Sequence, residues 1–197
     1  MSTENCVGVA QYSTAISDGV LAIITLVMSG KLLAASRLYA ASGFSIVTAA
    51  AVFGVMRFSQ VCPSNGLVSW HRYLSWLAQA VGMSLVSASF VQNHNPFLSS
   101  VIVMLPIAIA ILQGRILSTS LCATVGELVG SVAVVAICIV GCVTANGFAI
   151  VGVTLTAFAG VVVKTEGQIG GILRVDVFHY LLAIANIALT KGLAQYD

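Results

Sequence analysis

Long apolar stretches, broken by short polar segments, fill almost the whole chain. Seven such stretches can be marked, at residues 16–35, 38–58, 68–91, 97–112, 119–143, 148–163 and 172–193. A helix needs roughly 20 apolar residues to cross the hydrocarbon core of a bilayer, so most of these stretches have the length of a membrane span. The pattern predicts an all-α, polytopic transmembrane helical bundle of about seven spans, or six if 148–163 does not cross.

The breaks between the stretches carry turn signals. Residues 61–66 contain Pro, Asn and Gly, residues 92–96 are polar and end in Pro96, and residues 164–171 are rich in Gly. None of these breaks is long enough to hold a soluble domain. We therefore expect a single transmembrane domain over residues 1–197.

The composition supports this class. Hydrophobic residues make up 59% of the chain and charged residues 7%, against about a quarter charged in a soluble domain. Such a surface needs the lipid bilayer as its surroundings. The net charge of +2 and the scattered basic residues give no reason to expect nucleic acid as a partner. The first fifteen residues carry Glu4 and no basic region, so we expect no cleaved signal peptide.

Basic residues at the span ends favour one orientation. We call the membrane side of the N-terminus side A and the opposite side side B. Side A carries five basic residues and side B three; these are Arg57, Arg72, Arg115, Lys164 and Arg174 on side A, and Lys31, Arg37 and Lys191 on side B. Because cytoplasmic loops carry an excess of Lys and Arg, this bias predicts a cytoplasmic N-terminus. No signal identifies the organelle.

Small residues recur at helical spacing in two stretches. Ala41, Ser45 and Ala49 share one helix face, and so do Gly126 and Gly130. Faces of this kind let membrane helices approach closely. We expect a compact bundle.

The five cysteines are Cys6, Cys62, Cys122, Cys138 and Cys142. Their spacing shows neither a CxxC pair nor the repeated interval that is typical of zinc sites or disulfide frameworks. Cys138 and Cys142 lie one turn apart in an apolar stretch, which is typical of buried structural thiols. We expect no chemistry from the cysteines.

Ionisable residues inside the apolar stretches are the main functional candidates, because charges within a membrane are costly. The set is Asp18, His71, Glu127, Asp176 and His179. At a rise of about 1.5 Å per residue, all except Glu127 lie within roughly 10 Å of the side A boundary. Glu127 lies deeper, close to the middle of the membrane.

Two polar stripes follow from helical spacing. One consists of Asp176, His179, Asn186 and Thr190, and the other of His71, Ser75 and Gln79. The stripes predict a cavity that opens to side A and narrows inward, with carboxylates that hold the histidines in one tautomer. The structural alternative is that polar residues near the interface extend to the headgroups and pair only to orient the helices.

The last apolar stretch resembles part of a known protein family. Residues 174–183, which read RVDVFHYLLA, and residues 190–193, which read TKGL, resemble the ending of a family of small polytopic proteins of unassigned function. The last helix of that family carries an Asp-x-x-His signature, matched here by Asp176 and His179, and Asp18 in the first span fits it. The resemblance covers only these short stretches and implies a topology without a reaction.

A more distant similarity is to the seven-span superfamily that contains alkaline ceramidases and adiponectin-type receptors. It rests on His71, Asp176 and His179. There, histidines of an early and the last helix, with an aspartate, hold a catalytic zinc. The similarity implies His71, Asp176 and His179 as metal ligands. The chain departs from that pattern at two positions, since Ala183 stands where a second histidine of the last helix is expected and Leu67 stands where a serine is expected.

Three functions remain open. The first, which we favour, is a non-enzymatic membrane protein that binds or conducts a small molecule, ion or proton; its pathway residues would be Asp18, Glu127, Asp176, His179 and Asn186. The second is a zinc-dependent intramembrane lipid hydrolase. The third is a structural subunit, with a second copy or a membrane-complex partner. Haem is not expected, because both intramembrane histidines lie near one edge and no apolar slot for the ring is predicted.

Overall fold

The computed structural model describes residues 10–112 and 119–195, without the side chains of residues 119, 120, 122 and 123. Arg115 and Cys6 therefore lie outside the described residues, as does the side chain of Cys122. The described elements are α1 (Tyr12–Ala34), α2 (Leu38–Phe58), α3 (Asn65–Leu77), η1 (Ala78–Gly82), α4 (Met83–Val91), α5 (Pro96–Leu112), α6 (Thr119–Val143), α7 (Gly147–Phe158), η2 (Ala159–Val163), β1 (Gln168–Ile169), β2 (Ile172–Leu173) and α8 (Arg174–Ala194). The elements η1 and η2 are π-helical turns within longer helices.

The all-α bundle is confirmed, and the described residues form seven helices when the π-helical turns are counted with their neighbours. Five of them are long and apolar enough to cross a membrane: α1, α2, the continuous rod Asn65–Val91, α6 and α8. The helices Pro96–Leu112 and Gly147–Val163 are apolar but shorter. By the length and composition of its helices, the chain is thus a multi-pass membrane protein. For the two shorter helices, length alone does not decide whether they cross the membrane.

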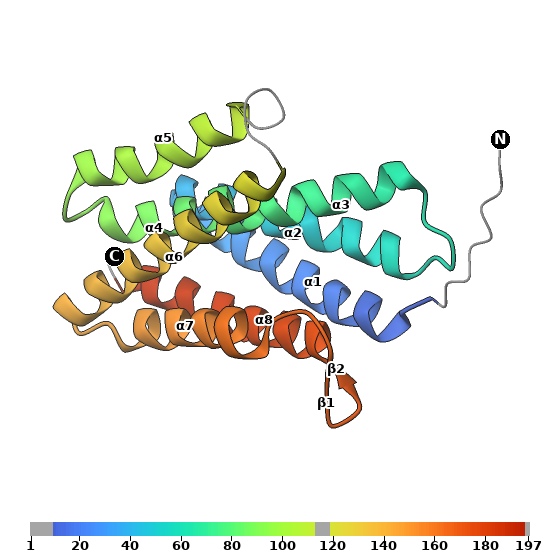
Figure 1. The fold of residues 1–197 in the computed structure, drawn as a ribbon. Coiled ribbons are helices and arrows are strands. Elements are labelled where there is room, and N and C mark those ends of the chain that lie inside the picture. The colour runs from blue at the N-terminus through green and yellow to red at the C-terminus, as the bar shows by residue number, and fades with distance from the viewer. Residues whose placement is uncertain (1–9, 113–118, 196–197) are drawn as a thin grey trace.

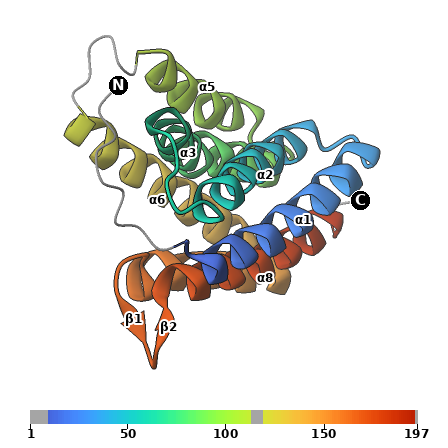
Figure 2. The same ribbon diagram turned by 90° about the vertical axis from the view of Figure 1, so that its right-hand side faces the viewer.

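Successive helices run back and forth between the two ends of the bundle (Figure 1). The start of α1 and the end of α8 consequently lie at opposite ends. Helix α1 packs against both α2 and α8, and α7 packs against α8 and α6. Figure 2 shows α1 and α8 side by side along their length. The first and last helices of the chain are therefore direct neighbours and run in the same direction.

The small residues of α2 pack against α1, as their spacing predicted. The Ser29 hydroxyl donates to the carbonyl of Ala41 at 2.8 Å and lies 2.9 Å from the Ser45 hydroxyl. One turn away, the hydroxyls of Thr25 and Thr48 are 2.8 Å apart. These interhelical hydrogen bonds are available because no large side chain separates the two backbones.

Close approach also explains the glycines of α6 and α2. A Cβ at Gly126 would lie 2.5 Å from Trp76 Nε1, and one at Gly130 would lie 3.3 Å from Gln79 Cγ. A Cβ at Gly43 would lie 2.5 Å from the carbonyl oxygen of Gly82 in η1. The expected tight packing is confirmed at these crossings.

The largest apolar cluster occupies the side B half of the bundle. It joins six helices, and its bulkiest buried members include Leu32, Phe44, Phe90, Ile137 and Leu189. At the side A end of the α1–α8 interface, the buried side chains include Thr14, Ser17, Asp18 and Asp176. A small apolar cluster that contains Leu21, Ala22 and Ala183 follows these polar side chains toward side B.

A short β-hairpin lies between η2 and α8, where the sequence predicted only a polar break. Strands β1 and β2 pair antiparallel, with Gln168 opposite Leu173. Gly170 and Gly171 connect them with φ values of 56° and 85°, the left-handed conformation that a two-residue hairpin turn requires and that glycine adopts without strain. The hairpin fixes the path by which the chain enters α8.

One expectation about the cysteines is wrong. Cys62, in the loop between α2 and α3, is disulfide-bonded. Cys138 and Cys142 have free thiols, but Cys138 is half-buried and Cys142 is exposed, so the expectation of two buried thiols is also wrong. Irregular cysteine spacing carried no signal for the bridge, because residues that are distant in sequence can pair once the fold brings them together.

Candidate functional site

Four polar residues meet where α1 and α8 pack together near side A. Ser17 and Asp18 lie in the second turn of α1, and Asp176 and His179 lie in the first two turns of α8. Ser17, Asp18 and Asp176 are buried, and His179 is nearly so. We call these four residues the polar network. Three of them were sequence candidates, whereas Ser17 was missed because a lone serine in an apolar helix gives no signal.

The polar network is a continuous chain of contacts. His179 Nδ1 lies 3.4 Å from Asp18 Oδ1 and 3.0 Å from Ser17 Oγ. Ser17 Oγ in turn lies 3.4 Å from Asp176 Oδ1 and 3.0 Å from the carbonyl oxygen of Thr14. A hydroxyl has a single proton to donate. When Ser17 donates to Asp176 or to the backbone, His179 Nδ1 must carry the proton that bonds it to Ser17 and Asp18.

Asp18 keeps one carboxyl oxygen without a partner. Its Oδ2 is buried and has no hydrogen-bond partner among the described residues, and the same holds for Thr14 Oγ1 one turn nearer side A. The carboxyl group packs directly on Gly54 of α2, where a Cβ would lie 2.6 Å from Asp18 Cγ and closer still to Oδ2. Gly54 is therefore the residue that makes room for the carboxyl group between the helices.

A second polar pair lies beside the polar network. Arg57 Nη1 donates to His71 Nδ1 at 3.0 Å, so His71 must accept at Nδ1 and carry its own proton on Nε2. The Arg57 guanidinium also lies over the Phe58 ring, 4.9 Å from its centroid. Its charge is close enough to act on the Asp18 carboxyl. Arg57 thus connects the polar network electrostatically to the side A end of α2.

Of the two polar stripes that were predicted to line a cavity, only one faces the interior of the bundle. The stripe of α8 does face the interior, since Asp176, Asn186 and Thr190 are buried. On the other stripe, Ser75 and Gln79 are exposed. At side A there is instead a shallow groove of about 140 Å³, lined by Arg57, Phe58 and four neighbouring residues. Arg57 therefore borders both the side A surface and the buried carboxyl groups.

Two sequence candidates lie away from the polar network. Glu127 is exposed on α6, which is not among the helices that form the network. Asn186 is buried on α8, ten residues beyond Asp176 and near Thr190, whose hydroxyl donates to the Asn186 carbonyl at 2.9 Å. The structure thus gathers Asp18, Asp176 and His179 but does not add Glu127 or Asn186 to them.

A metal centre finds no support in the geometry. Within residues 10–112 and 119–195, no group of three or more His, Cys, Asp or Glu side chains is placed to hold a metal ion. Of the suggested ligands, His71 accepts from Arg57, and Asp176 and His179 contact Ser17. A hydrolytic zinc needs three protein ligands and an open position. The zinc site and the lipid hydrolase therefore stay predictions from the sequence.

Comparison with protein-family models, with curated proteins and with solved structures finds no match to this chain. Neither of the two resemblances noted in the sequence is therefore supported by a family match. What can be said of function comes from the membrane fold and from the polar network.

Replacing Gly54 by Ala tests the packing around Asp18. The new methyl group must displace the carboxyl group, and we expect the free energy of unfolding to fall by about 1–3 kcal/mol, as for other overpacked sites. Gly30→Ala is the matched control, because a Cβ at Gly30 meets nothing within 4 Å. Thermal unfolding in detergent, followed by circular dichroism, compares the two. Equal stability of the two variants would contradict the described packing.

Proposed function

We propose that this protein binds a proton at the polar network and passes it across the membrane. The observation that carries the proposal is the buried Asp18 carboxyl group, whose Oδ2 has no hydrogen-bond partner among the described residues and whose Oδ1 contacts an imidazole. A carboxyl group buried in a membrane span without a full set of partners is a functional site by default. Carboxyl, imidazole and hydroxyl groups in contact are the parts from which proton relays are built.

A proton fits this site better than a larger cation does. Asp18 Oδ2 is packed against the Gly54 backbone, so little space remains for an ion beside it. Calcium takes six to eight oxygen ligands and magnesium requires about six. The described part of the chain offers no cluster of that size at the network. A proton needs one oxygen and no additional volume.

The contacts give the relay two ends. Asp18 lies at one end, Asp176 at the other, and His179 and Ser17 connect them. Asp176 is in the first turn of α8, where the helix dipole favours a negative charge. Asp18 is seven residues into α1 and has no such support. A proton taken up at Asp176, the end nearer side A, can move inward to Asp18 when the Ser17 and His179 hydrogen bonds reverse direction.

Access is from side A. Arg57 lines the side A groove and is also positioned to act on Asp18. Toward side B the path meets Leu21, Ala22 and Ala183, which are packed together and apolar. Release to side B therefore requires a second arrangement of α1 and α8. The proposed cycle is loading from side A followed by opening of this apolar contact.

Proton flux into liposomes tests the proposal. The purified chain is reconstituted in vesicles that contain a pH-sensitive dye, and a potassium diffusion potential drives proton entry. We expect wild-type flux above that of empty vesicles. We expect Asp18→Asn and His179→Gln to lose it, because each removes a titratable group from the relay.

Glu166→Gln serves as the control, since it removes an exposed carboxylate between η2 and β1 on side A without touching the network. It should conduct like the wild type, and Glu127→Gln should do the same because Glu127 is not joined to the network. Wild-type flux no greater than that of empty vesicles would contradict the proposal, as would full flux in Asp18→Asn.

We infer that side A is the non-cytoplasmic side. The disulfide of Cys62 lies in the α2–α3 loop on side A, and disulfides persist in oxidising compartments. The basic bias that predicted a cytoplasmic N-terminus is weakened, because Arg57 donates to His71 and Arg174 donates to the Val163 carbonyl. A basic side chain that is hydrogen-bonded within the protein is weaker evidence of membrane orientation than a basic side chain in a solvated loop.

Reporter fusions at the C-terminus test this orientation. With α8 ending on side B, a fused green fluorescent protein should fluoresce, whereas a fused alkaline phosphatase should be inactive because it remains in the cytoplasm. The opposite pair of results would place side A in the cytoplasm and would agree with the original charge rule.

A further inference from the structure

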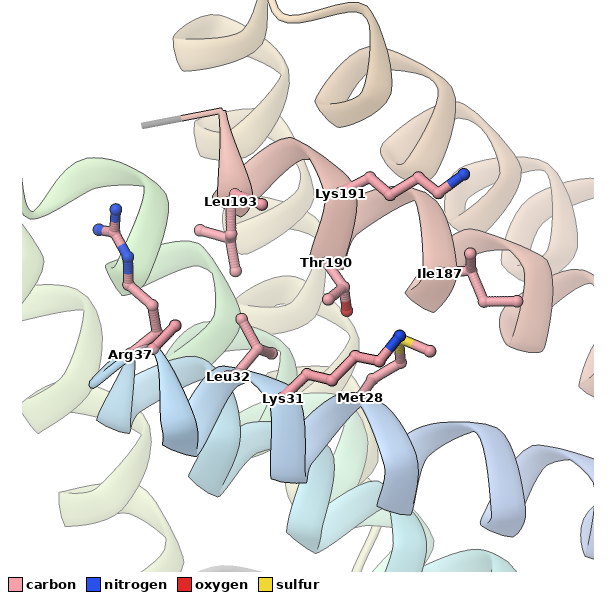
Figure 3. Close-up of a pocket in the computed structure, with 10 residues that line it drawn as sticks. Met28, Lys31, Leu32, Arg37, Ile187, Thr190, Lys191 and Leu193 are labelled. Atoms are coloured by element: carbon pink, nitrogen blue, oxygen red, sulfur yellow. The ribbon is translucent and has the colours of Figure 1, made fainter. Parts of the chain in front are cut away.

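A groove at the side B end separates α1 from α8, far from the polar network (Figure 3). Its volume is about 270 Å³. Six of its ten lining residues are aliphatic: Met28, Leu32, Ala35, Ile187, Leu193 and Ala194. The other four are Lys31, Arg37, Thr190 and Lys191, so the part of the lining that the structure describes holds three basic residues and no acidic one. The groove thus combines an apolar floor with a positively charged rim.

We propose that this groove binds an anionic phospholipid of the side B leaflet. Lys31 lies in the last turn of α1 and Lys191 in the last turn of α8, which is the depth of the lipid headgroups if these helices span the bilayer. In Figure 3, Leu32 and Thr190 point into the space between the helices, Lys31 lies along its edge, and Lys191 extends along α8 away from it. The basic rim suits a phosphate group, and the aliphatic floor suits part of an acyl chain.

Helix ends alone do not account for the groove. A lysine in the last turn interacts favourably with the helix dipole, and this explains one cation at the end of each helix. Lys191 also lies over the Phe148 ring, 5.5 Å from its centroid. Neither effect explains why Lys31 of α1 and Lys191 of α8 line one apolar groove in which the described lining residues include no carboxylate. Basic pockets between membrane helices are the usual binding sites of anionic headgroups.

The size of the groove agrees with this occupant. Pockets for drug-sized ligands usually measure about 300–1,000 Å³, and this groove is just below that range. Part of an acyl chain would fill it, with the rest of the lipid lying in the surrounding bilayer. The distance from the polar network also makes this site independent of the proposed proton relay.

Lipid retention tests the assignment. The full chain is reconstituted in nanodiscs that hold equal amounts of phosphatidylglycerol and phosphatidylcholine, and the lipids still bound after transfer to detergent are counted by native mass spectrometry. We expect the wild type to retain phosphatidylglycerol preferentially. In Lys31→Gln/Lys191→Gln the preference should fall on the order of fivefold for each lysine removed.

Arg72→Gln/Lys164→Gln is the matched control, because it removes two positive charges at side A and should keep the wild-type preference. Ile187→Phe leaves every charge in place but narrows the groove, and we expect it to retain less lipid. Equal retention of both lipids by the wild type would overturn the proposal, and so would an unchanged preference in the double lysine variant. Complete displacement of the lipid by inorganic phosphate would show a free-anion site instead.

Discussion

The contact between the first and last helices is the feature on which the rest of the site depends. Asp18 reaches His179 only because α1 and α8 lie side by side, and Gly54 of α2 leaves the space that the carboxyl group fills. Burying ionisable groups in a membrane protein costs several kcal/mol unless partners offset it. The network offsets part of that cost through His179 and Ser17, and among the described residues Asp18 Oδ2 has no hydrogen-bond partner.

The two ends of the bundle have different chemistry. On side A the α1–α8 interface holds the polar network, whereas toward side B the two helices contribute Leu32 and Leu189 to the large apolar cluster. The proposed relay needs access from one side at a time, and the contact of Leu21, Ala22 and Ala183 lies between the network and side B. The side B groove at Lys31 and Lys191 is a separate surface, with a different ligand.

Much of the fold could be predicted from hydrophobic runs, because the thickness of a bilayer sets the length of a span. Close helix packing at Gly126 and Ser45 could also be predicted, because small residues recur there at helical spacing. The network was only partly predictable: spacing placed Asp176 and His179 on one face, but nothing in the sequence said that α8 would contact Ser17. The sequence predicted how far along its helix Glu127 lies, but not which way its side chain points. Its exposure on α6 was therefore not predicted. The Cys62 disulfide depended on contacts between distant segments.

The central claim is that Asp18 gains and loses a proton within the network. Infrared difference spectroscopy of the reconstituted protein, recorded across a step to acid pH, measures this directly through the C=O stretching band of a protonated carboxyl group. The account predicts a band that is present in the wild type and in Glu166→Gln but is lost in Asp18→Asn. A band that survives unchanged in Asp18→Asn, or no carboxyl band in the wild type that depends on Asp18, would contradict it.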